Sequence, residues 1–172
     1  MLLSTLWPAA VAFARLPNEI VLTVHASITA PMPPELSKFG RHSLIQQRVK
    51  TLGDRLGYEG RTEVSTDEIV RARTGRLDVV WTHPDPKRSI AVEIDSAWRQ
   101  RSIQKLARMS ASHLCLWIYY GARPVVTDGA DQDLGGVNIL QVDPEALEIP
   151  QRRTRSVRAP NSGHPGRGQC RP

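Results

Sequence analysis

The sequence is poor in cysteine and has no long apolar run. Its two cysteines form no Cys-x-x-Cys pair, so neither a disulfide framework nor a thiolate metal site is expected, which favours a reducing, cytoplasmic compartment. No apolar stretch reaches the ~18 residues that a membrane span requires. Gly135-Gly136 is not followed by Lys-Ser/Thr, so a phosphate-binding loop is missing. These absences argue against a disulfide-rich protein, a membrane-spanning protein and a P-loop nucleotide-binding protein.

Motifs for a catalytic nucleophile are missing as well. Ser43, Ser96 and His113 stand in no recognised nucleophile pattern. Cys115 lies within an apolar segment, where a cysteine usually packs as a small hydrophobic side chain. Serine-type and cysteine-type catalysis therefore find little support.

Acidic residues are absent from the C-terminal end, and this absence shapes the charge distribution. Residues 151–172 contain six arginines and no acid, which equals the net charge of +6, and their Arg, Pro, Gly and Ser content predicts a disordered basic tail. From Lys38 to Arg108 there are 15 basic and 9 acidic residues, whereas Ala111 to Pro150 holds one basic and six acidic residues. A basic region suits a polyanion such as DNA, although a solvated surface with scattered arginines has the same composition.

Residues 1–31 are apolar without forming a clear targeting signal. The run ends in Ala12-Phe13-Ala14, a small-x-small pattern, but no Lys or Arg precedes it and Pro8 interrupts it. We therefore expect a poorly ordered leader, or an assigned start that lies too early with Met32 as the true one; secretion is the alternative. Within this segment, Ile20 to Ile28 could form an isolated strand. The expected organisation is a leader at 1–31, one α/β domain at 32–150 and the tail at 151–172.

Hydrophobic periodicity predicts a helix over Ser37–Leu56. Apolar residues recur there at helical spacing, Ser37 is a suitable N-cap, and Gly57 suits the position after the helix. Further elements are expected as a strand at Tyr58–Ser65, a helix at Trp98–Ser110, a buried strand at Leu114–Tyr120, strand material at Val125-Val126 and Val137–Val142, and a short helical turn at Asp143–Leu147.

Two short apolar segments at the centre of the chain carry acids. Leu77–Trp81 contains Asp78, and Ile90–Asp95 contains Glu93 and Asp95. The linker between them holds two prolines, which cannot continue a strand, so we expect two paired strands. Glu93 and Asp95 then share one face. If Asp78 faces the same way, three carboxylates converge, and Mg²⁺ or Mn²⁺ is the natural counter-ion.

A simpler interpretation of these acids is open at this point. Acidic residues that alternate with apolar ones usually form the solvated face of a half-buried strand. Taken singly, each of the three acids fits that interpretation.

The order of elements from Ser37 to Tyr120 resembles the restriction-endonuclease-like fold of PD-(D/E)xK nucleases. The residues that carry the resemblance are Gly75-Arg76-Leu77-Asp78, Val92-Glu93-Ile94-Asp95, and Gly57-Tyr58 followed by Glu63. The resemblance implies an αβββαβ core with a central mixed sheet flanked by helices. It also implies Mg²⁺-dependent hydrolysis of phosphodiester bonds in DNA.

The resemblance assigns roles to individual residues. Asp78 and Glu93 would be metal ligands, with Glu63 as an accessory ligand and Glu59 as a weaker candidate. Asp95 stands where the family motif has a catalytic lysine. In branches where the lysine has moved to the following helix, Lys105 would take its role here, ahead of Arg99 or Arg101. The implied catalytic residues are Asp78, Glu93, Asp95 and Lys105.

Two other functions stay open. The missing lysine favours a catalytically degenerate domain that binds nucleic acid or a protein partner without cleaving. An unrelated small α/β domain is the second alternative. The sequence leaves the oligomeric state open, a homodimer included.

Overall fold

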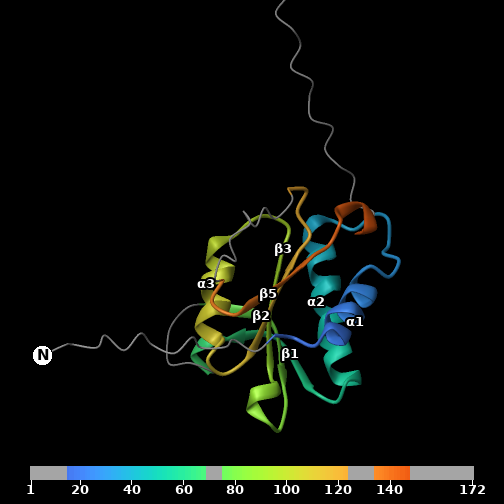
Figure 1. The fold of residues 1–172 in the computed structure, drawn as a ribbon. Helices are drawn as coiled ribbons and strands as arrows, with labels where there is room; N and C mark the ends of the chain where they lie inside the picture. The colour runs from blue at the N-terminus through green and yellow to red at the C-terminus, as the bar shows by residue number, and fades with distance from the viewer. Residues whose placement is uncertain (1–14, 69–74, 124–133, 148–172) are drawn as a thin grey trace, which may run out of the picture.

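The computed structural model describes residues 15–68, 75–123 and 134–147, and these form a mixed β-sheet with helices on both faces (Figure 1). The helices are α1 Asn18–Ile28, α2 Lys38–Arg55 and α3 Gln100–Met109. The strands are β1 Glu59–Ser65, β2 Arg76–Thr82, β3 Ile90–Asp95, β4 Leu114–Tyr119 and β5 Val137–Gln141. Single 3₁₀ turns span Thr66–Glu68, Pro86–Arg88 and Pro144–Leu147.

The five strands lie in the order β1-β2-β3-β4-β5. The first three pair antiparallel, whereas β3, β4 and β5 run parallel to one another. A parallel pair requires a crossover, and α3 supplies it between β3 and β4. This arrangement confirms the expected α/β class with a mixed sheet flanked by helices.

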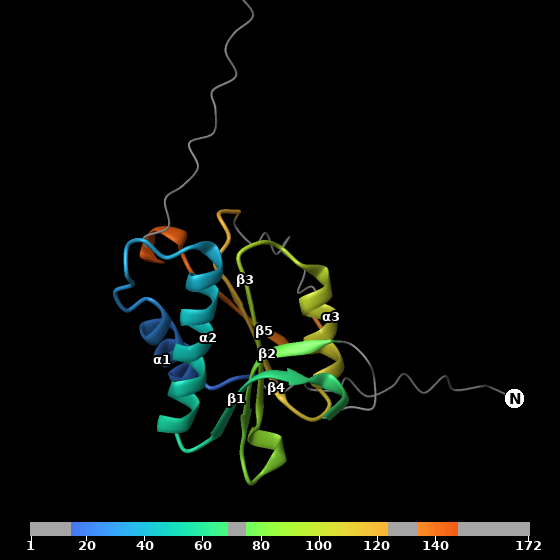
Figure 2. The same ribbon diagram turned by 180° about the vertical axis from the view of Figure 1, so that it is seen from behind.

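The helices cover the sheet from two sides, as the opposite views show (Figures 1 and 2). α1 and α2 bury Val24, Ile28, Ile45 and Val49 in one hydrophobic cluster against the sheet. α3 packs on the other face, where Ile103, Leu106 and Met109 contact a second cluster. All six residues of β3 are buried, because this strand lies between both layers.

The predicted helix at Ser37–Leu56 is confirmed together with its ends. The Ser37 hydroxyl accepts a hydrogen bond from the Gly40 amide at 3.0 Å, which satisfies a free N–H of the first turn. At the other end Gly57 has φ +85°, a left-handed conformation that glycine adopts without steric cost. Leu52 and Gly53 lie in the buried stripe, and Gly53 leaves room for the Trp81 indole.

The expected strand at Ile20–Ile28 is wrong, because these residues lie in α1. Their apolar side chains recur at helical spacing, and Val24 and Ile28 are fully buried against α2. The expectation of a poorly ordered leader is also wrong for residues 15–31. The Arg48 guanidinium donates to the carbonyls of Ile28, Ala30 and Pro31 at 3.2, 2.6 and 2.6 Å. The packed domain therefore begins before Met32.

Other expectations fall outside the described ranges. Residues 1–14, the pair Val125-Val126 and the tail 151–172 are among them. Within the described ranges, no helix combines the length and the apolar content needed to cross a membrane.

The position of α1 in the core predicts the effect of truncating one side chain. Ile28→Ala should lower the free energy of unfolding by about 2–5 kcal/mol, because it leaves a cavity between α1 and α2. Leu22→Ala, on the same helix but 69% exposed, should change it by less than about 0.5 kcal/mol. Urea denaturation measures both values. Equal effects of the two substitutions would contradict the packing of α1.

Candidate functional site

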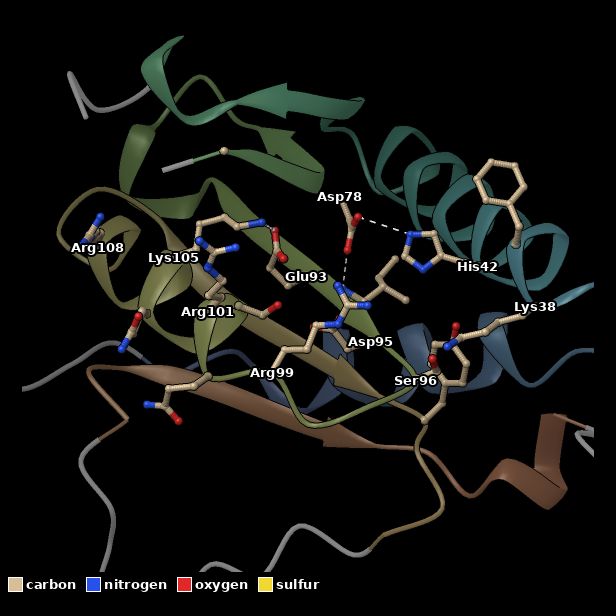
Figure 3. Close-up of a pocket in the computed structure, with 17 residues that line it drawn as sticks. Lys38, His42, Asp78, Glu93, Asp95, Ser96, Arg99, Arg101, Lys105 and Arg108 are labelled. Atoms are coloured by element: carbon tan, nitrogen blue, oxygen red, sulfur yellow. Dashed lines mark hydrogen bonds and ion pairs between the residues drawn. The ribbon is translucent and has the colours of Figure 1, made fainter. Parts of the chain in front are cut away.

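A pocket of about 1260 Å³ opens between the beginning of α2 and the length of α3, and acids from β2 and β3 line it (Figure 3). Asp78 comes from β2, and Glu93 and Asp95 come from β3. The remaining lining is mainly basic or polar. Its charged and aromatic members are Lys38, Phe39, His42, Arg99, Arg101, Lys105, Arg108 and Tyr120.

Asp78 lies where β2 and β3 separate. The cross-strand pairs between these strands run from Trp81–Ile90 to Val79–Val92 and end there. Beyond the last pair, the Ile94 amide donates to Asp78 Oδ2 at 2.7 Å, so a side chain takes the place of a backbone acceptor. The position follows from strand divergence, which turns the carboxylate from the sheet into the pocket.

His42 is the second partner of Asp78. Its Nε2 lies 3.4 Å from Asp78 Oδ1. The hydrogen bond to Asp78 raises the pKa of His42 above its usual value, against the opposing effect of burial. The pair therefore has a net tendency to hold a proton on the imidazole.

Glu93 is a buried carboxylate whose cationic partner among the described residues is Lys105. It is 4% exposed, and Lys105 Nζ lies 2.7 Å from its Oε1. Lys105 Nζ also donates to the Arg76 carbonyl at 2.5 Å, which fixes the ammonium between β2 and β3. Burial raises the pKa of Glu93 to about 7, the charge of Asp78 adds to the increase, and Lys105 opposes it. Glu93 can therefore exist in either protonation state near neutral pH.

Asp95 is held by two donors rather than left free. Trp117 Nε1 donates to its Oδ2 at 3.0 Å, and Arg99 Nε lies 3.2 Å from its Oδ1. The side chain is 7% exposed. The structure thus places Asp95 beside the other two acids, bonded to the indole of the buried Trp117 and to Arg99. This geometry suits a residue that positions Arg99 better than one that acts on a substrate.

Glu63 lies at the edge of the site. It is exposed and does not line the pocket, and its φ of 52° is unusual for a residue other than glycine. Gln46 Nε2 donates both to Glu63 Oε1 at 2.7 Å and to the Asp78 carbonyl at 2.9 Å. Glu63 therefore contacts the site through Gln46, whereas the weaker candidate Glu59 is exposed at the far end of β1.

Burial decides between the interpretations of the acids. Glu93 and Asp95 are buried, so the solvated-strand interpretation is wrong for them. The Lys105 side chain is only 15% exposed and ion-paired, unlike a solvated helix lysine. Arg101 lines the pocket but makes no ion pair with another described residue.

His42 and Gln46 are site residues that the sequence did not single out. They lie four residues apart on α2, at the border of the buried stripe that contains Ile45 and Val49. A polar pair beside an apolar stripe was the available signal. This polar pair belongs to the site only because β2 passes beneath it, and the sequence does not show that contact.

The residues present can be compared with the needs of a divalent cation. Within the described ranges, no group of three or more His, Cys, Asp or Glu side chains is arranged to hold a metal ion. Asp78 and Glu93 still offer carboxylate oxygens to one pocket. Mg²⁺ is commonly bound through one or two carboxylates, with waters and substrate phosphates completing its shell. The donor set therefore fits Mg²⁺ or Mn²⁺ that shares its shell with a substrate, rather than a site formed by protein groups alone.

The raised pKa of Glu93 predicts a pH dependence of stability. The folded state holds the Glu93 proton up to pH about 7, whereas the unfolded state loses it near 4.5. Protonated Glu93 therefore makes its full contribution to the free energy of unfolding below pH 4.5. This contribution, on the order of 3 kcal/mol, is lost as the pH rises through about 7. Glu93→Gln should remove this loss, while Glu63→Gln at an exposed position should retain it. Urea denaturation in EDTA at pH 5 and pH 8 compares the three proteins, and an unchanged slope in Glu93→Gln would refute the assignment.

Comparisons with known proteins add no assignment. No protein-family model, no curated protein and no solved structure matches this chain. A function for the pocket must therefore be argued from its own residues.

Proposed function

We propose that this chain is a metal-dependent nuclease that hydrolyses phosphodiester bonds in DNA through a site of the PD-(D/E)xK type. The observation that carries the proposal is the grouping of Asp78, Glu93 and Lys105 in one pocket, with Lys105 Nζ 2.7 Å from Glu93 Oε1. Carboxylates on adjacent strands beside a fixed lysine are the parts that the family motif requires. Here the lysine comes from α3 and not from the strand.

The order and direction of the elements support the proposal. α2 precedes three antiparallel strands, and α3 leads from β3 to the parallel β4. This is the αβββαβ order that the resemblance implies. The acids lie on the second and third of these strands, at the point where the two strands separate.

Asp78 and Glu93 would hold the cation. Burial, together with the charge of Asp78, raises the pKa of Glu93, and a nearby cation favours its ionised form. Bound there, Mg²⁺ supplies Lewis-acid polarisation of a phosphoryl oxygen and lowers the pKa of water. The partners of Asp78, His42 and the Ile94 amide, keep its carboxylate turned toward the pocket.

Lys105 would act on the reacting phosphate. In the hydrolysis, the oxygen of a water attacks phosphorus, one P–O bond of the backbone breaks, and the proton passes to the leaving oxygen or to solvent. Negative charge grows on the phosphoryl oxygens in this process, and a fixed ammonium stabilises it. Lys105 also favours the ionised form of Glu93, because it lowers the pKa of that carboxyl. Arg99, held by Asp95, is a second cation at the pocket.

The first test is metal-dependent cleavage by the full chain. Wild-type protein should nick supercoiled plasmid or degrade DNA with Mg²⁺ or Mn²⁺ and not with EDTA. Asp78→Asn and Glu93→Gln should each lower the rate at least about 100-fold, because each removes a carboxylate from the cation site. Circular dichroism verifies that both variants are folded. A folded wild-type protein that cleaves no DNA with either metal would favour the catalytically degenerate binding domain instead.

Lys105 gives a second, independent test. Lys105→Met should reduce kcat by about 100-fold or more, since it removes the cation beside the reacting phosphate, and Lys105→Arg should restore part of the rate. Because Lys105 lowers the pKa of Glu93, the pH–rate profile of the residual activity should move to higher pH. Lys50→Met is the matched control, as Lys50 pairs with Asp54 on the exposed side of α2. A lysine that only stabilises the fold would change the melting temperature without moving the pH profile.

A further inference from the structure

Phe39 places a free aromatic ring beside the charged groups of the pocket. It lies in the first turn of α2, is 78% exposed, and lines the same pocket as Asp78 and Glu93. A single exposed apolar side chain is ordinary on a protein surface. Phe39 differs in its surroundings, because the pocket that it lines also holds acids and cations, and its ring stacks on no other described aromatic residue.

Cations lie on both sides of the acids. Lys38 comes from the start of α2, next to Phe39, and Arg101 and Arg108 come from α3 (Figure 3). Arg99 and Lys105 are engaged by Asp95 and Glu93, but Lys38, Arg101 and Arg108 make no ion pair with another described residue. The pocket thus combines these free cations with buried acids and one exposed aromatic ring.

We propose that the pocket accepts an unpaired nucleic-acid strand, with one base stacked on Phe39 and the adjoining phosphates bound by Lys38, Arg101 and Arg108. This inference rests on the proposed function and specifies its substrate. Free cations and an exposed aromatic ring are the two components by which proteins bind single strands, since the cations hold the backbone and the ring stacks on a base of any identity.

An unpaired strand fits the geometry better than a duplex. In a duplex both faces of each base are covered by neighbours, so a ring such as Phe39 finds no face to stack on unless a base is extruded. Glu93, at the floor of the pocket, is 4% exposed, so the scissile phosphate has to enter the pocket to reach it. A flexible single strand can bend inward with its base turned toward Phe39.

The test measures binding in EDTA, where no metal-dependent cleavage occurs. Fluorescence anisotropy of the full chain with labelled single-stranded DNA, single-stranded RNA and duplex DNA of equal length gives three dissociation constants. We expect at least one of the single strands to bind more tightly than the duplex, and the DNA and RNA arms identify which. Equal or tighter binding of the duplex, or no binding to either single strand, would overturn the proposal.

Substitutions of Phe39 separate stacking from simple apolar contact. Phe39→Ala and Phe39→Leu should both weaken single-strand binding by about 5- to 150-fold, the range expected for one stacked base, and Phe39→Trp should retain it. Leu22→Ala, a loss of an equally exposed apolar side chain on α1, should leave binding unchanged. Full affinity in Phe39→Leu would rule out stacking. Binding that shows this pattern in a protein without nuclease activity would refute the proposed hydrolysis alone.

Discussion

The buried pair of Glu93 and Lys105 is the interaction on which the site depends. A carboxylate is costly to bury, and one partner at 2.7 Å compensates only part of that cost, as the pKa of about 7 indicates. The cost is imposed by β3, whose six residues are all enclosed between the helix layers. A sheet with a solvated face could carry the same acids without this cost, but they would then attract a cation far less strongly.

Next to this pair, the backbone of β1 and β2 is irregular at Glu63 and Asp78. Leu77 and Val79 pack in opposite hydrophobic clusters, although strict alternation would put them on one face. The alternation is broken at Asp78. On the neighbouring strand β1, Thr62 pairs with Val79 and Val64 pairs with Leu77, and the residue between them is Glu63, which has a left-handed backbone conformation. Gln46 bridges both strands at this point. The disturbance is local and lies beside the pocket, where strained backbone often serves to position a side chain.

Much of this could be predicted from the sequence, because local signals agreed with the tertiary structure. The apolar spacing of α2, the cap at Ser37 and the proline-rich turn before β3 each determine an element by themselves. α1 was missed because Ile20, Val21 and Thr23 are β-branched and favour strands. The helical spacing of its apolar residues stabilises a helix only when that side packs on α2. The burial of Glu93 and the contact of His42 with Asp78 could not be predicted, since both require knowing which layers enclose β3.

The partners of Asp95 limit which side chains can occupy its position. A lysine written into this position would place an ammonium against the Trp117 indole N–H, a donor facing a donor, with the guanidinium of Arg99 also nearby. A single Asp95→Lys substitution would therefore break both contacts of Asp95. Asp95, Trp117 and Arg99 therefore form one contact unit, and a cation at position 95 would require a change at both partners as well.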